Sequence, residues 1–182
     1  MNQEVKMKPS YLKIAFLDRD GTLIKDYPDE KWREIKEPEF LEGSIEGLKR
    51  LKEMGYDFII ITNQYLINDG IISLNDYQQF TGKFLKKLKE ENIDILKIYF
   101  CPHNEKDHCH CKKPKPGMIE QAKKDFLIDM NNSIYIGDSQ VDYLLAKHFN
   151  LSFYGVNYNG DNVKSYRSIL DISKQIKKIQ NK

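Results

Sequence analysis

Short apolar runs alternate with longer amphipathic segments along this chain. The apolar runs have the length and the β-branched content of buried strands, and they occupy residues 12–17, 56–62, 95–100, 133–136 and 151–156. Apolar residues recur at helical spacing in the segments 43–54, 74–91, 116–126, 141–148 and 168–179. Because strand and helix alternate, we predict a three-layer α/β/α fold with an open, mostly parallel sheet between helices. We expect the basic last helix to pack on the outside.

Polar side chains follow the predicted strands at their carboxyl ends. Ligands of such sheets bind beyond these ends, so residues far apart in the sequence are expected to meet there. The residues concerned are Asp18 and Asp20 after the first strand, Thr62, Asn63 and Gln64 at the end of the second, Lys113 after the third, and Asp138 after the fourth. Carboxylates are hard ligands that suit Mg²⁺, and a lysine is a point charge that suits phosphate. The set predicts a site for phosphoryl transfer.

All cysteines of the chain, and three of its four histidines, lie in the short segment 101–111. An odd number of closely spaced cysteines is a poor disulfide framework, whereas thiolates and imidazoles one residue apart suit a metal ion. Four such ligands make a closed, tetrahedral Zn²⁺ site with a structural role. We expect these ligands to be Cys101, His103, Cys109 and Cys111. His108 and His110 are close rivals to His103, and three reduced cysteines in a flexible loop are the alternative to a metal site.

Composition narrows the class of protein. The chain of 182 residues is 40% hydrophobic and 31% charged, which excludes a disordered chain and suits one domain over residues 1–182. Its net charge is only +2, whereas a nucleic-acid-binding protein usually has a larger and more clustered positive charge, so no nucleic-acid partner is expected. No apolar run is long enough to cross a membrane, and residues 1–10 lack the apolar stretch of a signal peptide. We expect a soluble, cytoplasmic protein that is a monomer.

Four ordered motifs, each near the end of a predicted strand or in the loop beyond it, resemble those of the haloacid dehalogenase superfamily of phosphatases: FLDRDGT, ITNQ, KPKPGM and IYIGDSQVD. The longer run CPHNEKDHCHCKKPKPGM is similar to the zinc-loop branch of that superfamily, which includes heptose bisphosphate phosphatases and histidinol-phosphate phosphatases. The resemblance covers residues 13–149. It implies a Rossmann-like domain. The gaps between motifs leave no room for a large cap domain, so the cover of the site is expected from loop 25–39, the zinc loop and the segment after Gln64.

The resemblance implies a role for each residue that matches a motif. Asp18 would attack phosphorus and become an aspartyl-phosphate, and Asp20 would protonate the leaving oxygen and then deprotonate water. Lys113 would offset charge on the nucleophile and on the transferring group. Mg²⁺ would be the catalytic cofactor, held by the side chains of Asp18 and Asp138 and by the backbone carbonyl of Asp20. Asp142, one helical turn after Asp138, either supports this metal site or lies on a solvated helix face.

The remaining matches concern the phosphate and the rest of the substrate. Thr62 and Asn63 fall in the second motif, whose hydroxyl and amide donors hold phosphoryl oxygens in the family, and Gln64 follows them. Lys112 stands where relatives carry a basic residue that contacts the substrate. Asp26 lies in a loop that also touches the substrate in relatives. The expected partner is therefore a small phosphorylated molecule.

Two stretches depart from the pattern of the heptose-phosphatase relatives. Those relatives usually read NQSGIARG, whereas residues 63–70 read NQYLINDG, with Leu66 in place of a flexible glycine and Asp69 in place of an arginine. Ser139 stands where relatives tend to carry a basic residue after the fourth-motif aspartate. Fewer positive charges at the entrance argue against a second phosphate on the substrate, while the reaction class is unaffected.

These observations leave several functions open. The first hypothesis is a Mg²⁺-dependent phosphomonoesterase that acts on a small sugar phosphate, with D-glycero-D-manno-heptose 1,7-bisphosphate as the leading substrate. Histidinol phosphate is the nearest rival. A 3′-phosphatase on nucleic-acid ends shares two of the motifs but lacks this zinc loop. A zinc-stabilised binding module without catalysis is a further alternative, against which the retained strand-end carboxylates and lysine argue together.

Overall fold

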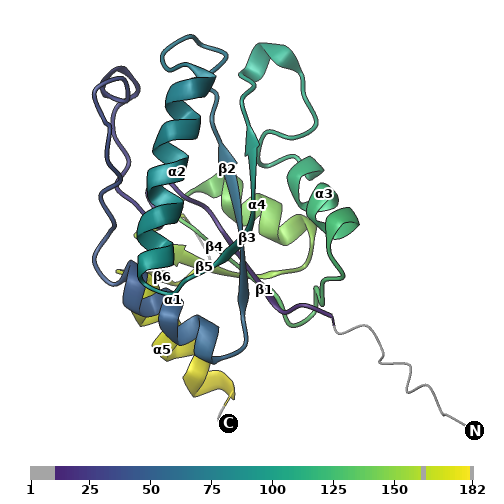
Figure 1. The fold of residues 1–182 in the computed structure, drawn as a ribbon. Coiled ribbons are helices and arrows are strands. Elements are labelled where there is room, and N and C mark those ends of the chain that lie inside the picture. The colour runs from purple at the N-terminus through teal and green to yellow at the C-terminus, as the bar shows by residue number, and fades with distance from the viewer. Residues whose placement is uncertain (1–10, 161–162, 181–182) are drawn as a thin grey trace, which may run out of the picture.

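The strands of this chain form one parallel sheet (Figure 1). The computed structural model describes residues 11–160 and 163–180, so the segment 1–10, which is expected not to be a signal peptide, lies outside the described residues. Within that part the six strands run in the order β3-β2-β1-β4-β5-β6, and each neighbouring pair is parallel. They are β1 (Ile14–Leu17), β2 (Asp57–Asn63), β3 (Ile95–Cys101), β4 (Ile134–Gly137), β5 (Ser152–Val156) and β6 (Ser165–Tyr166). The predicted α/β fold is confirmed.

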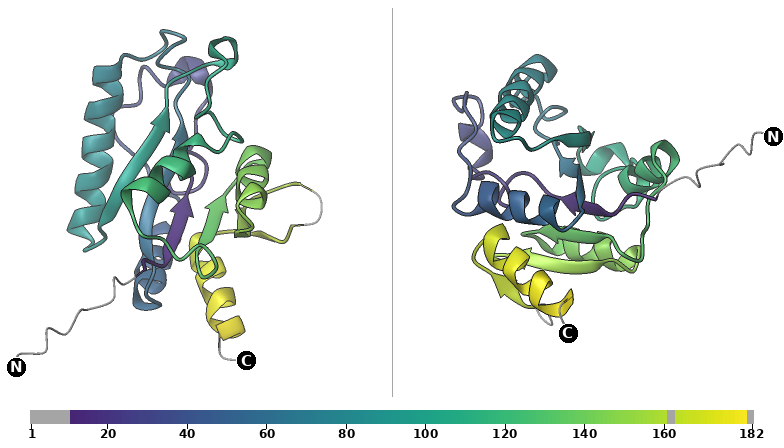
Figure 2. Two further views of the ribbon diagram at one scale, coloured as in Figure 1. Left: turned by 90° about the vertical axis from the view of Figure 1, so that its right-hand side faces the viewer. Right: turned by 60° about the horizontal axis from the view of Figure 1, so that its bottom comes forward.

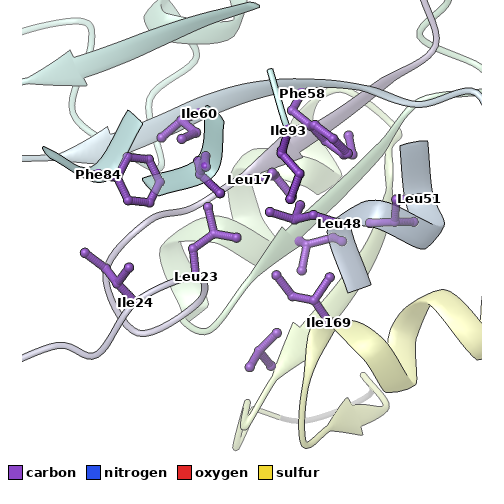
Figure 3. Close-up of a cluster of buried hydrophobic side chains, with 14 of the residues drawn as sticks. Leu17, Leu23, Ile24, Leu48, Leu51, Phe58, Ile60, Phe84, Ile93 and Ile169 are labelled. Carbon is purple, nitrogen blue, oxygen red and sulfur yellow. The ribbon is translucent and has the colours of Figure 1, made fainter. Parts of the chain in front are cut away.

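Helices cover both faces of the sheet (Figure 2). They are α1 (Ser44–Glu53), α2 (Leu74–Glu90), α3 (Gly117–Asp125), α4 (Gln140–His148) and α5 (Ile169–Gln180). The side chains of β1 alternate between two hydrophobic clusters. Ala15 and Leu17 pack with residues of α1, α2 and α5, whereas Ile14 and Phe16 pack with α3 and α4. Figure 3 shows Leu17 in the first of these clusters. This alternation fixes the register in which β1 presents its carboxyl end.

One strand was not expected from the sequence. The strand β6 is two residues long, too short to leave an apolar pattern in the sequence. The last helix packs with its apolar side inward, as an amphipathic outer helix does: Ile169, Ile172 and Ile176 of α5 are buried in the first cluster, where α5 packs on α1. Lys174 and Lys177, the lysines of α5 whose side chains the structure describes, are exposed. Among the described residues, no helix combines the length and the hydrophobicity that a membrane crossing requires.

Three loops, 25–39, 64–73 and 101–113, stand together beyond the carboxyl ends of β1, β2 and β3, at the upper edge of Figure 1. The first is fastened to the second by Arg33, which donates from Nε to the Ile71 carbonyl (2.5 Å) and from Nη2 to the Gly70 carbonyl (2.8 Å). No further domain is inserted between the described strands. These loops are therefore the only cover that the described chain offers at this edge.

Candidate active site

A buried lysine joins two aspartates at the carboxyl edge of the sheet. Asp18 directly follows β1, and Lys113 comes from the loop after β3. The Lys113 ammonium donates to Asp18 Oδ1 (2.5 Å), to Asp142 Oδ1 (2.8 Å) and to the Ile61 carbonyl (2.9 Å). These acceptors use all three of its protons. Since Lys113 is only 5% exposed, it is a fixed positive charge against the Asp18 carboxylate.

Carboxylates outnumber cations in this cluster, and the pKa values of Asp18 and Asp138 are raised. Burial raises the pKa of Asp18 well above its usual range; Lys113 lowers it, and Asp142 and Asp138 raise it again. Burial, followed by the charge of Asp142, raises the pKa of Asp138 to about 7. Burial lowers the pKa of Lys113, but Asp142 and Asp18 together raise it by more, so the ammonium stays protonated. A cation between Asp18 and Asp138 would relieve this repulsion.

Oxygen atoms that suit a divalent cation converge at the same place. One carboxylate oxygen from each of Asp18, Asp138 and Asp142 lies within 4.8 Å of the others. The carboxylate of Asp142 already accepts hydrogen bonds from Lys113, Tyr135 and Ser139. By contrast, no other described residue donates to the Asp138 carboxylate or to the Asp20 carbonyl. Such unpartnered, hard oxygens fit Mg²⁺, with Asp142 standing behind the ligands.

The carboxylate of Asp20 is held by a second cation, Arg19. Arg19 donates from Nε to Oδ1 and from Nη2 to Oδ2 of Asp20, each at 2.9 Å. Gln64 donates from Nε2 to Asp20 Oδ2 (2.7 Å) and to Thr62 Oγ1 (2.8 Å). Because Thr62 accepts this bond, its own hydroxyl proton can be donated to another group. The second motif therefore supports Asp20, in addition to the phosphate contact predicted for it.

Asn63 ties the end of β2 to the lysine loop. The backbone N–H of Lys113 donates to Asn63 Oδ1 (2.9 Å), and Asn63 Nδ2 donates to the Lys113 carbonyl (3.3 Å). Sequence reasoning predicted a phosphate contact for Asn63 and missed this scaffold role. The paired amide fixes the backbone from which the Lys113 side chain reaches Asp18.

The four side chains expected to bind zinc lie together in the loop after β3. Sγ of Cys101 is 3.6 Å from Sγ of Cys109, 3.0 Å from Sγ of Cys111 and 3.5 Å from Nδ1 of His103. His103 Nδ1 is 3.2 Å from Cys111 Sγ. Three soft thiolates and one imidazole, with no carboxylate among them, fit Zn²⁺ in a closed site.

The rival histidines lie elsewhere. His108 and His110 are exposed, and His110 pairs through Nε2 with Glu120 Oε2 at 2.8 Å. The geometry therefore favours His103 as the fourth ligand. The same loop leads directly into Lys113, and the backbone N–H of Lys112 donates to Cys109 Sγ (3.3 Å), so a metal held there would fix the position of Lys113.

Comparison with known proteins places this geometry in a family. A family model described as polynucleotide kinase 3 phosphatase matches residues 13–159, which is most of the chain. The chain belongs to this family of haloacid dehalogenase-type phosphatases. The predicted family and enzyme class are thereby confirmed.

Relatives of this phosphatase carry more specific names. D-glycero-alpha-D-manno-heptose-1,7-bisphosphate 7-phosphatase of Photorhabdus laumondii is 42% identical over 144 residues, 75% of this chain and 77% of that protein. D-glycero-beta-D-manno-heptose-1,7-bisphosphate 7-phosphatase of Pasteurella multocida is 41% identical over 141 residues, 74% of this chain and 76% of that protein. A crystal structure of D,D-heptose 1,7-bisphosphate phosphatase from B. bronchiseptica, complexed with magnesium and phosphate, matches with a TM-score of 0.80 and 22% identity over 92% of this chain and 99% of that one. That structure supports the same fold.

The phosphatase has a cavity of about 230 Å³ in front of Asp18. Residues that the sequence singled out supply much of its wall: Asp18, Asp20, Asp26, Thr62, Asn63, Gln64, Lys113 and Asp138. Sequence reasoning did not name several others: Asp29, Trp32, Tyr65 and Val141. These lie in the covering loops or at the start of α4, where no motif marks single residues.

Lys112 does not line this cavity. Its ammonium pairs with Glu105 Oε1 at 2.8 Å and lies 5.0 Å from the centre of the Tyr65 ring, which does line it. Lys112 thus stands at the rim, behind Tyr65. The expectation that it contacts substrate stays a prediction, and it requires Lys112 to leave Glu105.

The three departures from the relatives have structural partners here. Asp69 accepts a hydrogen bond from Asn104 of the zinc loop (2.8 Å) and does not line the cavity. Leu66 is 6% exposed and packs in the first hydrophobic cluster. Ser139 donates from its backbone N–H and from Oγ to Asp142 at the start of α4.

Proposed function

We propose that this phosphatase removes the 7-phosphate of D-glycero-D-manno-heptose 1,7-bisphosphate through an aspartyl-phosphate on Asp18. The observation that carries the proposal is the Asp18 carboxylate fixed beside Lys113 at the base of a cavity whose wall also contains Asp20 and Asp138. The names of the relatives at 41–42% identity support the choice of substrate.

In the proposed reaction the chain's own residues hold the nucleophile and move the proton. An Asp18 oxygen forms a bond to phosphorus while the bond from phosphorus to the sugar oxygen breaks, and Asp20 gives its proton to that oxygen. Water then attacks phosphorus, the bond to Asp18 breaks, and Asp20 takes a proton from the water. Lys113 offsets negative charge throughout, and the Thr62 hydroxyl donates to a phosphoryl oxygen.

Two metals accompany this proposal. Mg²⁺, held by the side chains of Asp18 and Asp138 and the carbonyl of Asp20, would offset the charge of nucleophile and phosphate. Zn²⁺ in the site of Cys101 and its neighbours would be structural, since four protein ligands leave no position for water.

The second phosphate of the substrate needs a cation at the rim of the cavity. Lys112 is the residue we assign to it, because it lies beside Tyr65 and its one carboxylate partner among the described residues is Glu105, whose side chain is 86% exposed. An ion pair with such an exposed partner is weak and is readily exchanged for a phosphate.

Histidinol phosphate is the second candidate, favoured by two carboxylates in the cavity wall. Asp26 and Asp29 line the cavity beyond the catalytic cluster, and carboxylates suit an ammonium group better than a second phosphate. The name of the matching family model brings 3′-phosphorylated nucleic-acid ends into the comparison as well. The net charge of +2 gives no support to a nucleic-acid partner.

The test is a substrate panel ranked by kcat/KM. It contains both anomers of heptose 1,7-bisphosphate, heptose 7-phosphate, histidinol phosphate and a 3′-phosphorylated oligonucleotide, each with Mg²⁺. We expect a heptose bisphosphate to rank first and Asp18→Asn to abolish turnover of every member. Preference for histidinol phosphate, or for heptose 7-phosphate over the bisphosphate, would overturn the substrate assignment and leave the phosphatase reaction in place.

A further inference from the structure

Arg19 is a buried cation with a single acidic partner. Its side chain is 2% exposed, and among the described residues Asp20 is the only carboxylate within ion-pair distance. The guanidinium centre lies 5.4 Å from the ring centre of Tyr77 and 5.3 Å from that of Phe80, and Nη1 donates to Thr81 Oγ1 at 3.3 Å. These three residues all belong to α2. The buried aromatic side chains of Tyr77 and Phe80 therefore also surround a positive charge.

Because Arg19 is buried against α2, the packing around Arg19 fixes the orientation of the Asp20 carboxylate. A guanidinium is planar and rigid, so a fork with two bonds of 2.9 Å fixes both the position and the plane of the carboxylate it holds. Burial of a cation is costly unless it is paired, so the fork persists. Asp20 lines the cavity whereas Arg19 does not, so any effect of Arg19 on bound substrate passes through Asp20.

We propose that Arg19 is a positioning residue, which aims the Asp20 carboxylate at the oxygen that leaves phosphorus. This inference rests on the proposed function, because it assigns to Asp20 the proton transfer described there. Arg19 keeps its own protons in every step. What it supplies is geometry: without the fork, Asp20 retains only the bond from Gln64 and can rotate away from the leaving oxygen.

Leaving groups of different basicity distinguish this role from a merely structural one. The leaving group of 4-nitrophenyl phosphate needs no proton, whereas those of phenyl phosphate and of an alkyl phosphate do. For each ester, kcat/KM reports the steps up to formation of the aspartyl-phosphate, so the later role of Asp20 towards water does not enter. The ratio of two kcat/KM values from one preparation is also independent of how much of the variant is folded.

The experiment compares Arg19→Lys, which keeps the charge and removes the fork, with Thr81→Val, which removes the outer contact of Arg19 and leaves Asp20 untouched. General acid catalysis contributes about 10²–10⁴ in rate, so partial misplacement should lower kcat/KM of Arg19→Lys about tenfold or more on phenyl and alkyl phosphate. On 4-nitrophenyl phosphate the loss should be no more than about threefold, by the same reasoning. Thr81→Val should keep the wild-type ratio, and Asp20→Asn should show the same selectivity more strongly.

The outcomes separate the inference from the proposed function. An equal loss of Arg19→Lys on all three esters would overturn the positioning role while leaving the phosphatase reaction intact. Selective loss on the esters with basic leaving groups would support it, whichever sugar phosphate proves to be the natural substrate. Absence of hydrolysis of any ester by the wild-type chain would overturn both.

Discussion

Two aspartates occupy the same position in two helix caps, and only one of them is buried. At the start of α2, Ser73 donates from its backbone N–H (3.1 Å) and from Oγ (2.6 Å) to Asp76 Oδ2. At the start of α4, Ser139 donates from the same two groups to Asp142 Oδ2. Asp76 is exposed, whereas Asp142 is 0% exposed and also accepts from Lys113. The substitution Asp76→Asn is therefore a matched control for Asp142→Asn.

The expected cost of Asp142→Asn follows from its donors. Asparagine has one acceptor oxygen and one NH₂ group. The NH₂ group must therefore face other donors, either Lys113 and Tyr135 or the N–H of Ser139. An unsatisfied buried donor costs about 1–3 kcal/mol, and removal of one charge from a buried pair costs about 3–5 kcal/mol. Because Lys113 keeps Asp18, we expect the lower end, about 3 kcal/mol, which lowers the Tm of a chain this size by about 6–12 °C.

Thermal unfolding followed by circular dichroism measures this difference. Excess Mg²⁺ is included, because Asp142→Asn also removes repulsion among Asp18, Asp138 and Asp142. Without the metal, that gain in stability would mask part of the loss. We expect a much smaller change of Tm in Asp76→Asn, because water replaces the exposed contacts it loses. Equal losses in the two variants would refute the reasoning, because Asp142 would then act only as a helix cap.

Three further predictions follow from the two candidate metal sites and the rim. The apparent Kd for Mg²⁺ should fall as pH rises through about 7 and then level off, because the metal binds the deprotonated Asp138 carboxylate, whose pKa is raised to about 7 without metal. Titration with Mg²⁺ followed by the fluorescence of Trp32, which lines the cavity, measures this Kd, and a Kd that does not vary with pH contradicts the prediction. A chelator that removes Zn²⁺ should lower Tm by several degrees even after Mg²⁺ is restored, since the loop has little apolar content of its own; an unchanged Tm means that the loop needs no metal. Glu105→Gln should raise kcat/KM for a bisphosphate a few fold by freeing Lys112, with no change for 4-nitrophenyl phosphate, and an equal gain on both would remove Lys112 from the distal phosphate.

The sequence predicted the strands and their polar ends because both depend on local order. A run such as Phe58–Ile61 is apolar at every position since both faces of β2 are covered, and its end can be read directly. The roles of Asp142 and Arg19 could not be read in this way. Helical spacing alone does not say which element packs over Asp142, and a charged residue between two aspartates gives no sign that α2 buries it. Both depend on tertiary contacts between segments far apart in the chain.

The substrate question turns on how the departures from the relatives are accommodated. The argument against a second phosphate assumed that Asp69 and Ser139 face the entrance. Ser139 does line the cavity, but Asp69 does not. Asp69 accepts a hydrogen bond from Asn104, and Asn68 beside it donates from Nδ2 to Asp107 Oδ2 (2.9 Å), so two asparagine–aspartate contacts join the segment after Gln64 to the zinc loop. A carboxylate engaged in this junction repels a distal phosphate less than one that faces the cavity. Asp69, which stands where relatives carry an arginine, is therefore better explained as a contact that joins two covering loops. It no longer counts against a bisphosphate substrate.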